Sequence, residues 1–327
     1  MDGAIPIWFE IASYIFVVAL LAVDFIIVHH RPHVPSMREA GLWVAFYTAL
    51  AVAFGFVLMS FAGTDSGGEF FAGWLTEYSL SIDNLFVFIV IMARFAVPKK
   101  LQQEVLMVGI VIALVLRGIF ILIGATLIAN FVWIFWIFGA FLLYTAFHQA
   151  FRSHDDEEET ENKLIGFLRR RITMSEHYDG LKLRTTWDGK RVFTPMLVLL
   201  MTIAATDVLF AFDSIPAIFG ITTNAFIVFT ANVFALMGLR QLYFLLGGLL
   251  ERLVYLKYGI AAILAFIGVK LMLHALHENQ LPFINGGKHV DWVPDIPTWL
   301  SLLVIVAAMF VATLASLIRG PKSTSAS

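Results

Sequence analysis

Two pairs of acidic residues lie within long apolar stretches of the sequence. Glu77 is followed six residues later by Asp83, and Asp207 is followed six residues later by Asp213. An ionisable side chain inside a membrane span is costly unless it is paired or hydrated, so such a residue marks a functional position by default. Carboxylate oxygens are the ligands that hard divalent cations prefer. The four acids therefore predict a binding site for such a cation within the membrane.

Neighbouring residues offer further oxygen ligands. Asn84 and Ser214 each directly follow one of the aspartates. Pro216, three residues after Asp213, removes a backbone hydrogen bond and displaces the carbonyl of Phe212. The chain contains no cysteine, so thiolate ligands are absent and copper(I) and zinc are disfavoured relative to calcium, magnesium or manganese.

The six-residue spacing limits which acids can share an ion. On a straight helix it separates two side chains by about 9 Å and about 120° of rotation. Glu77 and Asp83 therefore cannot bind the same ion unless the helix breaks. We predict instead that Asp83 and Asp213 form a central site, with Glu77 outward of it and Asp207 inward of it, so that one carboxylate serves each side of the membrane.

Four other charged residues lie within apolar stretches: Arg117, Arg240, Lys270 and Asp24. We expect the two arginines to be structural counter-charges for the acids. The alternative to ion binding is that the arginines and acids only form buried ion pairs that stabilise the fold. The two roles are compatible if the arginines bind the carboxylates when no cation is present. Lys270 is expected to be a local counter-ion. Asp24 is expected to pair at the membrane interface with the basic residues that follow it.

The composition requires a membrane. Of 327 residues, 60% are hydrophobic and 14% are charged, and the mean hydropathy is +0.84. A soluble domain of this length carries more charge on its surface, so lipid must cover much of this one. The net charge of −2 offers no basic surface for nucleic acid. The absence of cysteine also excludes thiol redox chemistry and disulfides.

Apolar stretches of about 20 residues, the length that crosses a bilayer as a helix, occur nine times. They predict an all-α, polytopic transmembrane helix bundle. The nine predicted spans cover about 7–28, 41–62, 70–95, 104–126, 130–150, 195–219, 223–247, 257–277 and 298–318.

Lysine and arginine gather in alternate loops, which predicts the orientation. Basic residues are in excess on the cytoplasmic side of membrane proteins. The loop 151–194 is rich in them, whereas the loops of the opposite side carry only Lys288 beside several acids. We therefore expect a multi-pass protein of the cell inner (plasma) membrane, with its N-terminus outside and its C-terminus in the cytoplasm.

Spans three to five resemble spans six to eight. Two further matches follow the acidic pairs in the same order: an arginine seven residues before a glycine, and a glycine nine residues before a histidine. Because the two groups start from opposite sides of the membrane, they predict two inverted three-helix repeats, an architecture of secondary transporters. The matched residues are Arg117 and Gly124 with Arg240 and Gly247, and Gly139 and His148 with Gly268 and His277.

The organisation follows from these repeats. The loop 151–194 carries an acidic and a basic run; we expect a solvated linker or a short helical hairpin, or acids that collect cations at the cytoplasmic mouth. The predicted divisions are two N-terminal helices in 1–69, the first repeat in 70–150, the cytoplasmic loop in 151–194, the second repeat in 195–277, and an outer loop, last helix and tail in 278–327.

Two segments resemble the signature motifs of the TerC family. These are Glu77-Tyr-Ser-Leu-Ser-Ile-Asp83-Asn84-Leu-Phe-Val and Thr206-Asp207-Val-Leu-Phe-Ala-Phe-Asp213-Ser214-Ile-Pro216-Ala, and the similarity covers about 7–319. TerC proteins were named for tellurium resistance, and the resemblance to their Alx-like branch implies manganese export. It also implies an ion-binding role for the four acids. Some relatives have a glutamate three residues before Asp207, where this chain has Ala204, which leaves the metal open.

The expected function is efflux of a divalent cation by alternating access, with Mn²⁺ favoured over Ca²⁺ or Mg²⁺ and protons as a coupling ion. No permanently bound cofactor is expected. The alternative is a non-transport scaffold in tellurite stress or membrane-protein assembly. Enzymatic activity is not expected, because no HExxH or GxSxG signature is present. The sequence does not define the oligomeric state.

Overall fold

The computed structural model describes most of the chain. It covers residues 5–30, 35–131, 133–151, 178–187, 190–246, 255–279, 281, 285–287, 290, 293–294 and 296–319. Some side chains inside these ranges, that of Asp83 among them, are outside the description. The predicted acidic run of the long loop also lies outside the described residues.

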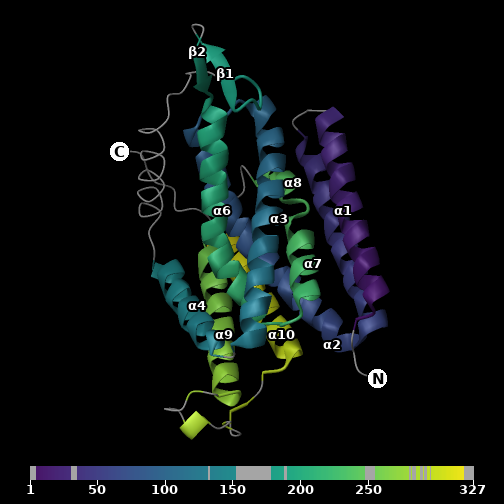
Figure 1. The fold of residues 1–327 in the computed structure, drawn as a ribbon, viewed down its shortest axis with the longest axis vertical. Coiled ribbons are helices and arrows are strands. Elements are labelled where there is room, and N and C mark those ends of the chain that lie inside the picture. Colours follow the sequence, from purple (N-terminus) through teal and green to yellow (C-terminus); the bar gives the residue numbers. More distant parts are fainter. Residues whose placement is uncertain are drawn as a thin grey trace.

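Apolar helices form nearly all of the described fold (Figure 1). Eight of its helical segments are long and apolar enough to cross a membrane, α7 and α8 counting as one. This confirms an α-helical, polytopic architecture. The helices are α1 (Ile7–His30), α2 (Met37–Arg94), α3 (Lys99–Asn130), α4 (Ile134–Phe151), α6 (Pro195–Phe219), α7 (Ala225–Leu236), α8 (Leu239–Leu246), α9 (Leu256–His277) and α10 (Thr298–Arg319), with a 3₁₀ turn η2 (Asn285–Gly287).

Eight segments stand where nine spans are predicted, because the second and third predicted spans both lie on α2. This helix has 58 residues, about 87 Å if it were straight, against a hydrocarbon core of about 30 Å. Gly63 breaks it, with φ of 89° and ψ of 169°, a conformation that residues with a side chain rarely adopt. The two parts of α2 consequently run in different directions (Figure 1).

A short β-hairpin stands where a linker or helical hairpin is predicted. Strand β1 (Arg184–Trp187) pairs antiparallel with β2 (Lys190–Phe193). The Arg184 guanidinium lies 4.5 Å from the ring centroid of Phe193. Tyr178, just before the hairpin, donates a hydrogen bond of 2.8 Å to the carbonyl of Phe95. The hairpin is thereby fixed over one end of the bundle, here called the hairpin end; the opposite end is the far end.

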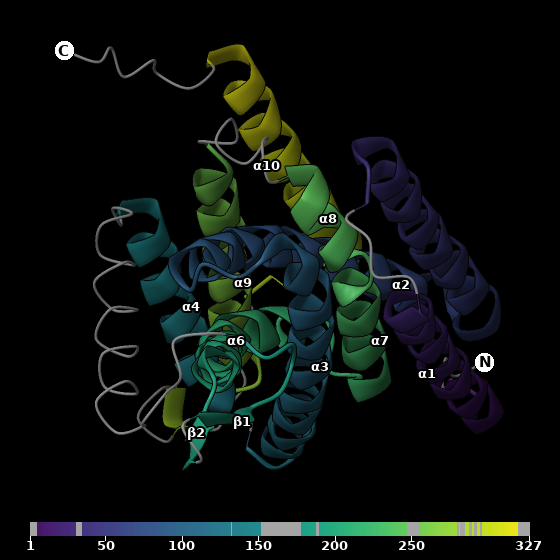
Figure 2. The same ribbon diagram turned by 90° about the horizontal axis from the view of Figure 1, so that it is seen from above.

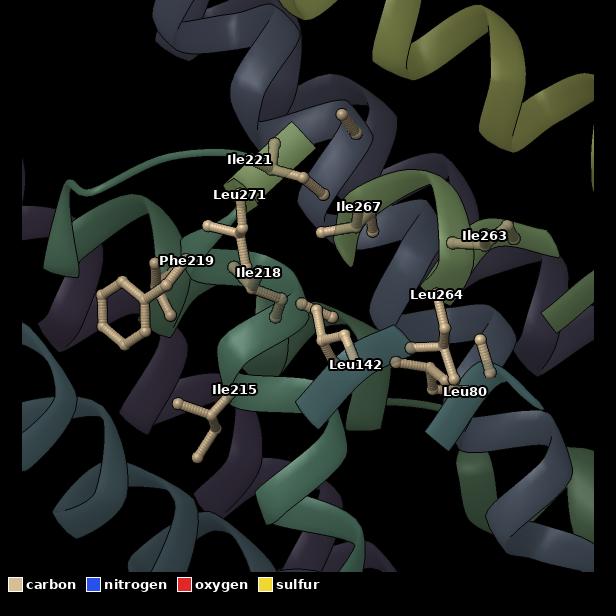
Figure 3. Close-up of a cluster of buried hydrophobic side chains, with 14 of the residues drawn as sticks. Leu80, Leu142, Ile215, Ile218, Phe219, Ile221, Ile263, Leu264, Ile267 and Leu271 are labelled. Atoms are coloured by element: carbon tan, nitrogen blue, oxygen red, sulfur yellow. The ribbon is translucent and has the colours of Figure 1, made fainter. Parts of the chain in front are cut away.

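The second part of α2 and α6 run in opposite directions through the bundle. Near the hairpin end, one apolar cluster joins residues at the end of α2, such as Leu85 and Met92, to residues at the start of α6, such as Leu199. Toward the far end, a second cluster joins the end of α6, including Ile218 and Phe219, to α4 and α9 (Figure 3). Polar side chains between the two clusters are consequently shielded from both ends.

Helices α4 and α9 cross in close contact at two glycines. A Cβ on Gly139 would lie 3.0 Å from the Gly268 carbonyl oxygen and 2.7 Å from Met272 Cγ. A Cβ on Gly268 would lie 3.1 Å from the Gly139 carbonyl oxygen. Only glycine lets the backbones approach so closely, as in other membrane helix pairs. The glycines that the sequence matches between spans five and eight therefore meet each other.

We predict that Gly139→Ala lowers the thermal unfolding midpoint of the purified protein in detergent. The added methyl group overpacks the contact, at a cost of about 1–3 kcal/mol. The matched control is Gly41→Ala, because a Cβ on Gly41 meets no atom within 4 Å and alanine favours a helix. Equal midpoints for the two variants would contradict the close contact.

Candidate ion-binding site

A buried cluster of three charged residues lies at the centre of the bundle. Arg117 of α3 contacts the carboxylate of Glu77 on α2, and its Nη2 lies 3.4 Å from Oδ1 of Asp207 on α6. The exposed fractions are 1% for Arg117, 0% for Glu77 and 2% for Asp207. These three residues are called the triad below. With all groups ionised the triad carries one net negative charge, and one carboxylate is in excess over the guanidinium.

The triad retains acceptor and donor capacity. Among the described residues, Asp207 Oδ2 and Arg117 Nε are buried without a hydrogen-bond partner. Ser214 and Thr76 also have buried hydroxyl oxygens without a partner. Buried polar atoms are normally paired, so the unpaired carboxylate oxygen of Asp207, with the Thr76 hydroxyl next to Glu77 in the chain and the Ser214 hydroxyl about two helical turns from Asp207, is suited to a cation.

The position of the triad alters the predicted order of the acids. Glu77 and Asp207 are predicted on opposite sides of the site, but they meet at one guanidinium. Because α2 and α6 run in opposite directions, the Asp83 backbone lies about 9 Å from Glu77 toward the hairpin end, and Asp213 lies about 9 Å from Asp207 toward the far end. The helix geometry thus favours Glu77 and Asp207 as the central acids, flanked by the two others. The Asp83 side chain itself lies outside the description.

The remaining predicted ligands lie on the helices of the triad. Asp213 accepts a hydrogen bond of 3.2 Å from Thr145 of α4. Ser214 and Asn84 are both buried. Pro216 lies inside α6 without ending it, since the helix continues to Phe219. The helix therefore does not end at the proline.

Arg240 has different partners from Arg117. Its Nη2 lies 2.9 Å from Oδ1 of Asp24, and Tyr47 donates a hydrogen bond of 2.8 Å to the same oxygen. Asp24 thus pairs with a residue 216 positions away; the basic residues predicted as its partners have side chains outside the described set. A cavity of about 530 Å³, lined by α1, α3 and α8, adjoins this ion pair. Arg240 consequently links α1 to the second predicted repeat.

Lys270 belongs to a polar group at the far end that contains two residues missed in the sequence. Lys270 Nζ lies 3.3 Å from Ser301 Oγ and close enough to Glu69 for their charges to interact. Thr222 donates a hydrogen bond of 2.5 Å to Glu69 Oε2. Glu69 falls just outside the predicted span, which begins at residue 70. Its position eight residues before Glu77, about two helical turns, is the signal that would have placed it on the same helix.

The hairpin end carries a different kind of charged contact. Asp179 accepts hydrogen bonds from Lys182 and Thr185, both at 3.1 Å. These bonds lower the pKa of the Asp179 carboxyl from its usual value. The group is exposed, in contrast to the triad, and it provides a control for substitutions of the buried acids.

The described residues contain no group of three or more histidine, cysteine, aspartate or glutamate side chains placed to hold a metal ion. The triad offers two carboxylates with an arginine between them. A cation would have to replace the guanidinium to bind both. This donor set suits a transported ion that binds and leaves, and it differs from the complete ligand shell of a structural metal site.

Known proteins resemble the chain over most of its length. Residues 62–324 match the integral membrane protein TerC family. An uncharacterized membrane protein of Mycobacterium tuberculosis is 46% identical over 308 residues, which are 93% of this chain and 77% of that protein. An uncharacterized membrane protein of Myxococcus xanthus is 38% identical over 93% of this chain and 90% of its own length. No solved structure was found to match.

The bundle of apolar helices around a buried charged cluster defines a polytopic integral membrane protein. The chain belongs to the TerC family. Its relatives include Alx of Escherichia coli, described as a candidate membrane-bound redox modulator, which is 38% identical over 268 residues, covering 79% of this chain and 84% of Alx. This confirms the resemblance to the TerC family and its Alx-like branch.

We predict that Arg117→Leu strongly destabilises the protein. The substitution leaves two buried carboxylates without their counter-charge, a loss of about 3–5 kcal/mol. The double variant Glu77→Gln with Arg117→Leu should recover part of this loss, because it removes one uncompensated charge. Thermal unfolding of the purified variants measures both effects. If Arg117→Leu were no less stable than the natural chain, the triad would not be a buried ionic contact.

Proposed function

We propose that this protein transports a divalent metal cation, Mn²⁺ in preference, out of the cell across the inner membrane. The hairpin end would face the cytoplasm, since the loop 151–194 is rich in basic residues. The N-terminus would then lie outside and the C-terminus inside. Protons would serve as the coupling ion, because the carboxylates that bind the cation also bind protons.

The triad is the observation that carries this proposal. Arg117 places one positive charge between Glu77 and Asp207, the position that a cation would occupy in the loaded protein. A divalent ion supplies twice that charge and would compete with Arg117 for both carboxylates. Arg117 would release the acids when the ion binds and return to them when it leaves. The empty carrier would therefore never hold two unpaired buried carboxylates.

The arrangement of the helices supports inverted repeats. Glu77 and Asp207, which are matched in the two predicted repeats, meet at the triad, and the matched glycines Gly139 and Gly268 meet where α4 crosses α9. Contacts between matched residues are expected near the axis that relates two repeats. Transporters of this kind place their substrate at that interface, near the middle of the membrane.

Apolar packing separates the triad from the hairpin end. The cluster that includes Leu85, Met92 and Leu199 lies between them, and the cavity beside Leu85 there measures only about 10 Å³. A hydrated ion needs far more room, so this arrangement corresponds to a state closed toward the cytoplasm. Transport would require the two apolar clusters to part in turn, so that the triad opens to one side of the membrane at a time, as alternating access demands.

We predict that Glu77→Gln and Asp207→Asn each reduce Mn²⁺ transport by about tenfold or more, since loss of a metal-binding group costs at least as much as loss of its outer-shell support. Purified protein in liposomes that contain a Mn²⁺-sensitive dye gives the rate directly. Cellular manganese with and without the chain gives the direction.

The matched control is Asp179→Asn, which neutralises an exposed acid at the hairpin end and should transport at the natural rate. Full transport by both buried variants would rule out the triad as the ion site. If the natural protein moved none of Mn²⁺, Mg²⁺ and Ca²⁺ in liposomes, the proposed function itself would be wrong.

A further inference from the structure

A second polar site lies at the far end of the bundle, apart from the triad. It is a cavity of about 260 Å³ bounded by α4, α9, the start of α10 and the turn that follows α6. Glu69 of α2 also lines it. Glu69 lies eight residues before Glu77, so the cavity is about 12 Å from the triad along α2. Its polar lining consists of Glu69, Thr222, Thr223, Lys270, His274 and Thr298.

The polar groups of this cavity are arranged around one carboxylate. Glu69 accepts the 2.5 Å hydrogen bond from Thr222 and interacts with the charge of Lys270 across the cavity. Asp65, one helical turn before Glu69, adds a second negative charge nearby. Lys270 is also 3.3 Å from Ser301 of α10. The ammonium therefore has an alternative oxygen contact on α10 while it remains within range of Glu69.

Apolar residues occupy the positions that match Glu69, Thr222 and Lys270 in the other predicted repeat. Leu199 lies eight residues before Asp207, as Glu69 lies eight before Glu77. Met92 and Leu199 are almost completely buried in the apolar cluster near the hairpin end.

The positions that match Thr222 and Lys270 are likewise occupied by apolar residues, Met92 and Phe141. Met92 lies fifteen residues after Glu77, as Thr222 lies fifteen after Asp207, and Phe141 follows Gly139 by two residues, as Lys270 follows Gly268. Two related repeats would by themselves give two similar ends. The polar residues of the far end are thus an addition to one end only, which indicates a task that belongs to one side of the membrane.

We propose that this cavity is the outer port for the transported cation, with Glu69 as its ligand and Lys270 as a built-in competitor. The proposal rests on the transport function proposed above. A divalent cation that leaves the triad would bind Glu69 together with the hydroxyl of Thr222. Lys270 would repel the ion and return to the carboxylate, so that the port binds weakly and releases its ion outward. Release in one direction needs such a competitor, because a strong outer site would hold the ion.

The absence of cysteine from the chain allows a direct test by single cysteines. Thr223→Cys places a thiol on the exposed part of the cavity lining. A membrane-impermeant thiol reagent should label it in intact cells, and Mn²⁺ should slow the labelling, whereas Na⁺ at equal ionic strength should not. The matched control, Thr186→Cys on exposed β1, should be labelled only after the cells are lysed. Labelling of Thr223→Cys only after lysis, or labelling that Mn²⁺ does not slow, overturns the port.

Substitutions in the same background assign the two charges. Glu69→Gln should abolish the protection by Mn²⁺, and Lys270→Met should lower the Mn²⁺ concentration needed for protection by about thirtyfold, the effect of a unit charge on a divalent ion across about 4 Å of water. Glu10→Gln on α1 and Lys257→Met at the other end of α9 are the controls and should change neither quantity.

The outcomes separate this port from the proposed function. If Glu77→Gln abolishes transport while Glu69→Gln changes neither transport nor protection, the port is wrong and the transporter stands. If Mn²⁺ protects Thr223→Cys in a Glu69-dependent manner but liposomes show no transport, the cation site is real and transport is wrong. Unchanged protection in Lys270→Met would remove the competitor role of that lysine.

Discussion

The contact of Arg117 with Glu77 and Asp207 fixes the centre of the molecule. Three ionised groups in a low-dielectric interior are tolerated only when each is compensated by the others. The contact therefore binds α2, α3 and α6 together at one level of the bundle. Because the two acids come from helices that run in opposite directions, this single interaction also sets the relative heights of those helices and of every residue along them.

The rest of the bundle is arranged around this ionic centre. Apolar clusters above and below it exclude water, which strengthens the attraction between the charges. The break at Gly63 lets α2 return toward the bundle after its first part. The glycine contact between α4 and α9 brings these helices together behind α6. Figures 1 and 2 both place α4 on one side of α6 and α1 on the other, so α1 lies at the periphery of the bundle.

The two arginines at matching positions of the predicted repeats have different ion-pair partners. Arg117 pairs with acids of both predicted repeats, whereas Arg240 pairs with Asp24 of α1, outside them. The ends differ as well, with a polar cavity at the far end and close apolar packing at the hairpin end. Such differences fit the directional transport proposed for this protein, since a fully symmetric molecule would treat both sides of the membrane alike.

The sequence alone determined the membrane environment, the positions of the apolar helices and the residues with unusual chemistry. Hydrophobic stretches of sufficient length must become helices in lipid, where backbone groups find partners only within the helix. Charged residues within them are evident from their type. For these reasons the predicted spans lie on helices, and Glu77, Asp207 and Arg117 are visible without a structure.

Only the tertiary structure decided which of these charges meet. The spacing of Glu77 and Asp83 is a property of one helix, but the height of α2 against α6 depends on contacts between residues 130 positions apart. That height places Glu77 beside Asp207 and moves Asp213 toward the far end. The pairing of Arg240 with Asp24, and the union of Glu69, Thr222 and Lys270 in one cavity, likewise arise from helices that the chain brings together only on folding. The local sequence determines which side chains each helix contains. The packing of the helices determines the depth of those side chains in the bundle and the direction in which they point.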